Sequence, residues 1–274
     1  MFDTIGYWSE IKLDIVKGYA AAYSKIMAAQ KMKAPFRHFY IDAFAGAGIH
    51  ISKTSGEFVL GSPQNALLVD PPFSECHWID VDGQKIEHLR QIARGYKNVY
   101  IYEGDCNSIL LERVFPLIRY EDYCRALCLL DPYGLHLDWK VMEAAGKSKT
   151  IEMFLNFPVA DMNRNILWRN PEAAELTQIV RMDRFWGDNS WRNVVYNNTG
   201  NLFGYDEKVE DANSVIAQAF RERLRKVAGF SHVPEPIPMR NSIGAIVYYL
   251  FFAAHRQVAA NIVRDIFGKY RDYR

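Results

Sequence analysis

Cysteine is scarce in this chain, and the cysteines present do not stand at the spacing of a metal or redox motif. They are Cys76, Cys106, Cys124 and Cys128, none forms a CxxC pair, and none has a histidine at zinc-ligand spacing. We therefore expect no metal site and no disulfide. Reduced and mostly buried thiols in a cytoplasmic protein fit this pattern.

Long apolar runs, a net charge and internal repeats are missing as well. The longest apolar run, Ile246 to Ala254, is roughly half of the ~20 residues that a spanning helix needs. Asp3 and Glu10 interrupt any apolar segment at the N-terminus, so we expect no signal peptide and no membrane association. Because 33 basic residues face 32 acidic ones, any site for a polyanion has to be a local patch.

What the sequence does contain is a regular alternation of strand and helix patterns. A leading helix is predicted from Trp8 to Met27, with Ser9 available as its N-cap. Predicted strands then follow at 38–44, 76–81, 98–103, 126–131 and 151–157, and predicted helices at 62–68, 83–94, 107–119 and 138–145. Ser62-Pro63 reads as a helix start, and Gly95 and Gly146 read as helix ends. Such alternation is typical of a mostly parallel sheet with helices on both faces.

The pattern changes after Pro158. A polar stretch with tryptophans and arginines runs to about Gly204, and an amphipathic helix follows near 211–228. The remaining segments predict an edge strand at 233–240, a central strand at 245–255 that pairs with it as a hairpin, and a closing helix at 258–270. We expect one domain over 1–274, with an N-terminal helical cap at 1–30 and a helical insert at 159–230 that is the candidate acceptor-binding region.

An acidic residue stands at the end of each of the first four predicted strands. The first strand runs through Asp42 into a turn that carries Gly46 and Gly48, and Asp80, Asp105 and Asp131 follow the next three. Each aspartate alone could be a solvated strand end. Four in series beside a glycine turn favour a ligand site, because ligands of open α/β sheets bind at the carboxyl edge.

Five parallel strands that end in a hairpin resemble the core of class I S-adenosylmethionine-dependent methyltransferases. The chain is more closely similar to the three-Cys-motif partner protein family, a resemblance that covers almost the whole chain. It rests on DAFAGAG (42–48), GSP (61–63), IDVD (79–82), LLDPYG (129–134), NFPVADMNRN (156–165) and YYLFFAAH (248–255). The resemblance implies a Rossmann-like methyltransferase fold and S-adenosylmethionine as cofactor, and it leaves the substrate open.

The resemblance also implies roles for the aspartates and the glycine turn. Asp80 would accept hydrogen bonds from the ribose, and Asp105 from the adenine amino group. The turn that receives the methionine end of the cofactor would consist of Asp42, Phe44, Ala45, Gly46 and Gly48.

Asp131-Pro132-Tyr133-Gly134 stands where amino-methyltransferases carry a catalytic tetrapeptide with two prolines and an aromatic residue. Asp131 and Tyr133 are therefore the catalytic candidates, Asp131 for a target amine and Tyr133 for stacking on a flipped base. Here the second proline is missing and the aromatic comes one residue early, so a turn that merely closes a strand is the alternative. Asp70-Pro71-Pro72-Phe73 matches the tetrapeptide in letters, but it falls in a connecting loop at the opposite edge of the sheet.

The insert supplies the candidate acceptor-binding residues Asn163, Arg164 and Trp168. Arginine can bind phosphate, and tryptophan can stack on a base. The alternative is a surface helix whose Trp168 packs into the core, which fits the same sequence. The preferred function is methyl transfer to a nitrogen of a nucleic-acid base. A non-catalytic partner subunit of a neighbouring iron-sulfur or radical enzyme, encoded nearby with the three-cysteine motif, and a small-molecule methyltransferase are the alternatives.

Overall fold

A seven-stranded sheet forms the centre of the molecule. The computed structural model describes residues 2–31, 34–170, 174–197 and 207–270. The strand order is β11-β12-β8-β7-β2-β5-β6, and only the pairings of β12 are antiparallel. This confirms the predicted, mostly parallel sheet with a C-terminal antiparallel hairpin. The strands are β2 (Arg37–Asp42), β5 (Glu75–Asp80), β6 (Val99–Glu103), β7 (Cys124–Leu130), β8 (Ile151–Phe157), β11 (Ile237–Arg240) and β12 (Ile246–Ala253).

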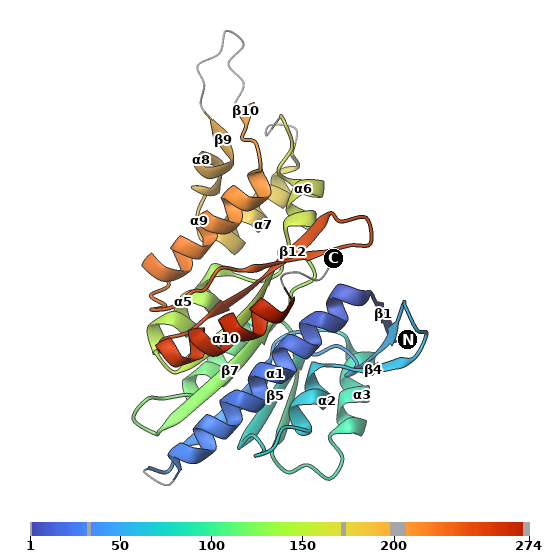
Figure 1. Ribbon diagram of the computed structural model, residues 1–274, viewed down its shortest axis with the longest axis vertical. Coiled ribbons are helices and arrows are strands. Elements are labelled where there is room, and N and C mark those ends of the chain that lie inside the picture. The colour runs from blue at the N-terminus through green and yellow to red at the C-terminus, as the bar shows by residue number, and fades with distance from the viewer. Residues whose placement is uncertain (1, 32–33, 171–173, 198–206, 271–274) are drawn as a thin grey trace.

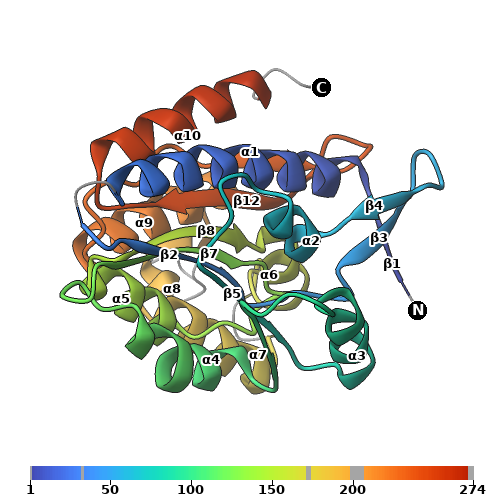
Figure 2. The same ribbon diagram turned by 90° about the horizontal axis from the view of Figure 1, so that it is seen from below.

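Helices cover both faces of this sheet (Figure 2). On each face, the helices and the strands together enclose one apolar cluster. One face packs against α1 (Tyr7–Gln30), α2 (Ser62–Leu67), α3 (Gly83–Ile92) and α10 (Gln257–Tyr270). The other packs against α4 (Cys106–Ile109), η1 (Leu110–Val114), η2 (Phe115–Leu117), α5 (Trp139–Ser148), α6 (Val159–Asn165), α7 (Leu176–Trp186), α8 (Trp191–Val195) and α9 (Ala212–Lys226). Among the described residues, no helix has the length and apolar character that crossing a bilayer requires.

The side chains of the central strands alternate between these two clusters, as the pleat of a strand requires. In β7, Ala126, Cys128 and Leu130 belong to the α5 side, whereas Leu127 and Leu129 belong to the α1 side. The same alternation directs several polar residues of β2, β7 and β8 toward α1. They are His38 and Asp42 in β2, Asp131 just beyond β7, and Glu152 and Asn156 in β8.

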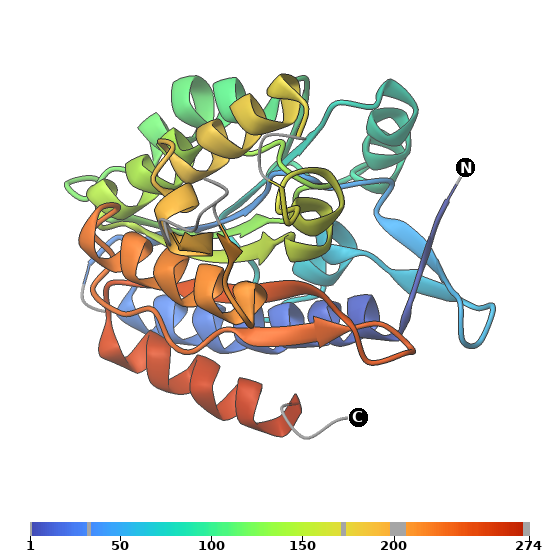
Figure 3. The ribbon, with the colours of Figure 1, turned by 90° about the horizontal axis from the view of Figure 1, so that it is seen from above.

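The segment after β8 is the predicted helical insert, and the structure confirms its place after the fifth parallel strand. Figures 1 and 3 show it in yellow and orange, on the same side of the sheet as α5. Its helices fill the core with large side chains, among them Trp186 and Trp191, which are 2% and 1% exposed. The short antiparallel pair β9 (Tyr196–Asn197) and β10 (Glu207–Lys208) completes it.

The molecule also has a second, three-stranded sheet, which the sequence patterns do not predict. It consists of β1 (Asp3–Ile5), β3 (Ile49–Ser52) and β4 (Phe58–Leu60), and β1 pairs with β3 in parallel. These strands have three or four residues each, too few for a period of two to stand out. The pairing of β1 with β3 also joins distant parts of the chain, which local patterns do not encode.

Several helix ends differ from the predicted ones. Gly6 and Gly61, not Ser9 and Ser62, occupy the N-cap positions of α1 and α2. The helix predicted at 107–119 divides into α4, a π-helical turn and a 3-10 turn, and Pro116, which lacks a backbone N–H, stands in the last of them.

Gly146 is not the C-terminal glycine of its helix, contrary to the prediction. It lies inside α5, which continues to Ser148 and ends at Lys149 in the left-handed conformation (φ 57°). The reason for glycine is packing, since a Cβ at position 146 would lie 2.0 Å from the backbone oxygen of Ala228. The residue therefore allows the loop after α9 to lie directly on α5.

We predict that Gly146→Ala lowers the free energy of unfolding by about 1–3 kcal/mol or more, because the methyl group meets a backbone atom that cannot rotate away. Urea unfolding measures this. Gly268→Ala is the matched control, because that glycine also lies in a helix and has no atom within 4 Å of an added Cβ. Equal stability of the two variants would contradict the packing role of Gly146.

Candidate functional site

The polar residues of the central strands meet at the carboxyl edge of the sheet. β2 lies between β5 and β7, and the chain leaves β2 toward β5 on one side and returns to β7 on the other. The boundary between β2 and β7 is thus the topological switch point, where open α/β sheets bind ligands. Asp42 ends β2, and Asp131 directly follows β7.

Asp131 forms an ion pair with Lys12 of α1. The Lys12 side chain is buried, with 8% of the residue exposed, and the ring of Tyr248 lies 5.5 Å from its ammonium nitrogen. Burial acts to lower the pKa of Lys12, but the attraction of Asp131 outweighs it and raises this pKa above its ordinary value. Asn156 Nδ2 donates to the other carboxylate oxygen of Asp131 at 2.9 Å. Asp131 is therefore held by one ammonium and one amide.

Asp42 is completely buried beside this pair. Burial, together with the nearby charge of Asp131, raises its pKa from 3.8 to about 7, against the opposing effect of hydrogen bonds from Ser62 and the Phe44 amide. The Phe44 amide donates to Asp42 Oδ1 at 3.4 Å. Near neutral pH the Asp42 carboxyl is consequently only partly ionised.

The turn after β2 is held against the end of β5. The Gly46 amide donates to Asp80 Oδ2 at 2.8 Å, and the Asp82 amide donates to Asp80 Oδ1 at 2.9 Å. Gly46 and Gly48 both have positive φ angles, 62° and 77°, which glycine adopts without strain. Ala45 N donates to Ile79 O at 2.9 Å. The structure thus brings together the predicted cofactor residues of the turn and Asp80.

Asp105 lies at the end of the neighbouring strand and has a structural task. Its carboxylate caps α4 by accepting from Ser108 N at 3.0 Å, and it accepts from Asn107 Nδ2 at 3.0 Å. Partial burial acts to raise the pKa of Asp105, but these hydrogen bonds outweigh it, so the pKa is lowered. Asp105 also lies close to the strand that ends at Asp80, because the amide of the preceding residue, Gly104, donates to Asp80 O at 3.0 Å.

Tyr133, the other catalytic candidate, is 66% exposed. Its hydroxyl donates to Asp3 Oδ2 at 3.2 Å, and Lys85 of α3 donates to the same oxygen at 2.8 Å. Strand β1 therefore lies over the turn after β7. This contact is not predictable from local sequence patterns, since it depends on the small sheet of β1, β3 and β4.

Four buried polar atoms at this edge have no hydrogen-bond partner within the described residues. They are His50 Nδ1, Gln64 Oε1, Asn156 Oδ1 and Asp161 Oδ2. Asp161 lies against the turn after β7, where a Cβ on Gly134 would be 2.6 Å from its Oδ2. Buried polar atoms without partners are rare in native proteins and point to a missing polar ligand or water. The edge thus offers both charged and neutral groups to a polar ligand.

The predicted acceptor-binding residues are largely engaged within the insert. Asn163 Nδ2 donates to Asn213 Oδ1 at 2.6 Å, and Lys208 donates to Asn163 Oδ1 at 3.0 Å. Trp168 Nε1 donates to the backbone oxygen of Arg164 at 2.8 Å, and both side chains are exposed. Among the described residues, no hydrogen bond joins this trio to Asp131 or Tyr133.

A cavity of about 890 Å³ borders the ion pair instead, through Tyr248. It lies between the start of α1, the β3–β4 loop and the β11–β12 loop, and its wall combines basic and aromatic side chains: Tyr7, Trp8, Lys53, Arg240 and Tyr248. Local sequence patterns do not reveal this cavity, because three segments that are distant in the chain form it. One signal of the neighbouring ion pair is present in the sequence, since Lys12 stands on the apolar stripe of the leading helix together with Tyr19 and Tyr23.

Within the described part of the chain, no group of three His, Cys, Asp or Glu residues could hold a metal ion. All four cysteines are free and buried.

Comparison with known proteins supports the fold. No family model and no curated protein matches the chain. Among solved structures, protein LPL1258 of Legionella pneumophila, described with the family model DUF519, has a TM-score of 0.51 at 11% identity over 95% of this chain and 92% of that one. A candidate S-adenosylmethionine-dependent methyltransferase of Listeria monocytogenes has a TM-score of 0.42 at 11% identity over 81% and 92%.

A candidate methyltransferase of Thermobifida fusca scores 0.42 at 14% identity over 89% of this chain and 80% of that one. At such identities the likeness concerns the fold alone, and the two lower scores carry no argument. The sheet order, the antiparallel β12 and the helices on both faces form a Rossmann-like α/β fold, which the likeness to LPL1258 supports.

We predict that Asp42→Asn stabilises the protein increasingly as the pH rises. Between about pH 4 and pH 7 the buried carboxyl stays protonated in the folded state and is ionised in the unfolded state, so raising the pH favours unfolding of the wild type. The stability difference between variant and wild type should grow by on the order of 1 kcal/mol per pH unit in this window. Urea unfolding across the window measures it.

The exposed Asp265 of α10 supplies the control. Asp265→Asn should differ from the wild type by an amount that does not change with pH. A constant difference for Asp42→Asn as well would show that Asp42 titrates normally.

Proposed function

We propose that this chain binds S-adenosylmethionine at the carboxyl edge of its sheet and transfers the methyl group to a nitrogen acceptor. The observation that carries the proposal is the gathering of Asp42, Asp80 and Asp131, with unpartnered buried polar atoms, around the switch point of a methyltransferase-like sheet. A ligand with an amino acid end, a ribose and a base supplies the matching donors and acceptors.

The residues of the edge fit this cofactor in their chemistry. Asp80 keeps free lone pairs on both oxygens after accepting from Gly46 and Asp82, and in the proposal these lone pairs accept from the ribose hydroxyls. Asp105 beside Cys106 would face the adenine. The turn of Phe44, Ala45, Gly46 and Gly48, with Asp42, would receive the methionine end. When bound, the cofactor supplies a methyl group on a sulfonium that is already a good leaving group.

Asp131 and Tyr133 belong to the acceptor side of this proposal. The acceptor nitrogen would donate a hydrogen bond to Asp131, sharing the carboxylate with Lys12 and Asn156, and this contact would orient the nitrogen lone pair toward the methyl group. A nucleic-acid base is the preferred acceptor, stacked on Tyr133. In this proposal residues 159–230 of the single domain contribute Asn163, Arg164 and Trp168 to the nucleic acid, and the cap at 1–30 contributes Lys12. The four free, buried cysteines suit a cytoplasmic setting.

One observation favours a second function, a non-catalytic partner subunit. Asp131 already forms an ion pair with Lys12 and a hydrogen bond with Asn156, so the group expected to bind an acceptor is internally satisfied. The resemblance to the three-Cys-motif partner family points the same way, with an iron-sulfur or radical enzyme encoded nearby as the partner.

A small-molecule methyltransferase is the third candidate, and the balanced charge of the chain favours it over a nucleic-acid enzyme.

We predict that Asp80→Ala weakens the binding of S-adenosylmethionine at least about tenfold, since it removes charge-assisted hydrogen bonds to the ribose. Calorimetric titration of the purified chain measures the dissociation constant. Asp70→Ala is the matched control, because its Asp-Pro-Pro-Phe tetrapeptide follows α2 and lies at the other edge of the sheet. Equal binding by both variants and the wild type would place the cofactor elsewhere, and no binding by the wild type would favour the partner subunit.

We predict that Asp131→Asn abolishes methyl transfer and leaves cofactor binding within about threefold of the wild type, because Asp131 acts on the acceptor. Transfer of labelled methyl from S-adenosylmethionine is measured separately into DNA, RNA and small-molecule fractions of a cell extract. Asp70→Asn should transfer at the wild-type rate. Wild-type transfer by Asp131→Asn would remove Asp131 from the mechanism.

A further inference from the structure

A second cavity lies at the opposite edge of the sheet from the proposed methyl-transfer site. It has a volume of about 320 Å³ and lies between the second half of α1, the first residues of β7 and β8, and the start of α10. This volume is within the range of small-molecule sites. Because parallel strands begin here, none of the strand-end aspartates can reach it, and the proposed function does not use it.

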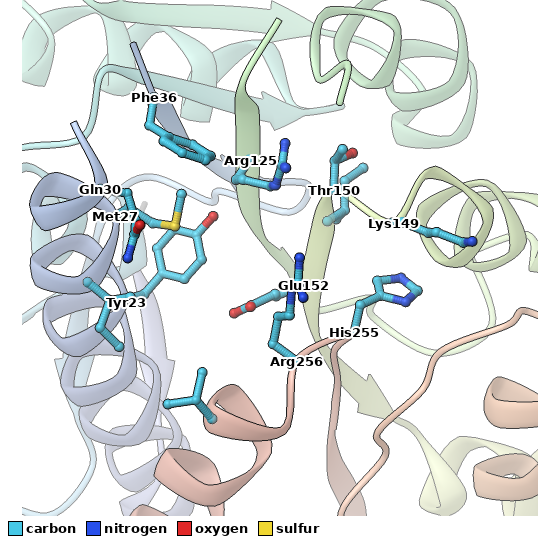
Figure 4. Close-up of a pocket in the computed structure, with 13 residues that line it drawn as sticks. Tyr23, Met27, Gln30, Phe36, Arg125, Lys149, Thr150, Glu152, His255 and Arg256 are labelled. Carbon is cyan, nitrogen blue, oxygen red and sulfur yellow. The ribbon is translucent and has the colours of Figure 1, made fainter. Parts of the chain in front are cut away.

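The floor of this cavity contains a polar group without a partner. Tyr23 is 5% exposed, and its hydroxyl has no hydrogen-bond partner among the described residues. Figure 4 shows this hydroxyl and the Glu152 carboxylate pointing into the space between α1 and β8. Glu152 itself accepts a hydrogen bond from Tyr19. A buried donor that faces a cavity calls for a ligand that accepts from it.

Basic side chains line the cavity. Among the described residues they are Arg125, Lys149 and Arg256, and the one carboxylate of this lining is Glu152. Burial raises the pKa of Glu152 to about 7, so part of this acid is neutral at physiological pH. The salt bridges formed by the described residues include none of the three cations. The cavity therefore carries positive charge that no carboxylate of the described part of the chain balances by an ion pair.

The lining also has an apolar part that includes an aromatic ring. Ile26, Met27, Phe36, Ile151 and Val258 contribute this part, and Gln30, Thr150 and His255 add neutral polar groups. The Arg125 guanidinium is held by the rings of Tyr120 and Phe36, at 4.2 Å and 5.4 Å from their centres, and donates to the Cys124 oxygen at 2.7 Å. A fixed guanidinium beside an apolar wall suits an anion that is attached to a flat apolar body.

We propose that this cavity is a binding site for a small organic anion, a carboxylate or phosphate monoester on an aromatic or aliphatic body. Arg125 binds the anionic group, the Tyr23 hydroxyl donates to it, and the apolar body lies against Met27 and Phe36. The site is separate from the cofactor edge, but both are lined by α1, which contributes Lys12 at one edge and Tyr23 at the other.

Calorimetric titration of the full chain with phenyl phosphate, benzoate and the neutral benzyl alcohol tests this proposal. We expect at least one of the two anions to bind with a dissociation constant below about 1 mM, and the alcohol at least about tenfold more weakly. The better anion distinguishes phosphate from carboxylate recognition. Failure of both anions to bind, or equal binding of the alcohol, would overturn the proposal.

Variants locate the binding. Arg125→Gln should weaken binding of the better anion about tenfold, and Tyr23→Phe, which removes only the hydroxyl, a few-fold. Arg90→Gln on the exposed surface of α3 is the control and should bind like the wild type. A loss in either folded variant that the control does not share supports the site. Wild-type binding by both variants, or the same loss in the control, rejects it.

Discussion

The ion pair between Lys12 and Asp131 is the contact on which the arrangement of this molecule depends. It joins the first helix of the chain to the strand end at the switch point, with Lys12 buried and Asn156 completing the coordination of the carboxylate. A buried charge left without its partner is strongly destabilising, so α1 and the turn after β7 have to be placed together. That placement also puts one positive charge beside two carboxyls, Asp131 and Asp42, and sets the electrostatics of the edge.

Helix α1 crosses the sheet from this edge to the other. Lys12, Tyr19 and Tyr23 follow one stripe of the helix, and Tyr19 contacts Glu152 near the start of β8. The strands present polar groups to α1 because their side chains alternate, and the apolar residues between them form the core. One helix thus borders both the carboxyl edge, where we propose methyl transfer, and the cavity at the amino edge.

Much of the fold could be predicted from the sequence, because long apolar strands and amphipathic helices are local signals. The five parallel strands β2, β5, β6, β7 and β8 and the helices between them follow from alternation, and the hairpin of β11 and β12 follows from a proline-bearing strand beside an apolar one. The small sheet of β1, β3 and β4 could not, since its strands are short and its first pairing is long-range. The prediction that Gly146 ends a helix is wrong, because a tertiary contact with Ala228, which local sequence does not reveal, requires glycine at this position inside α5.

The sequence predicts which candidate residues stand at strand ends, although their roles in binding and catalysis stay predictions, and it does not reveal the residues that other elements bring to them. Asp42, Gly46, Asp80 and Asp131 meet at one edge because parallel strands end together. Lys12, Asp3 and the wall of the cavity at Tyr248 arrive from helix, strand and loops distant in the chain. Motif letters alone mislead as well, since Asp70-Pro71-Pro72-Phe73 lies in the loop between α2 and β5, away from these strand ends.

Hydrogen–deuterium exchange of the whole chain with and without S-adenosylhomocysteine tests whether the carboxyl edge binds the methyl donor. We expect the ligand to slow exchange in the turn at 42–48 and at 79–82 and 104–106, with no change at 70–73. Protection confined to the amino edge, or none at 42–48 under saturating ligand, would show that the carboxyl edge is not the cofactor site.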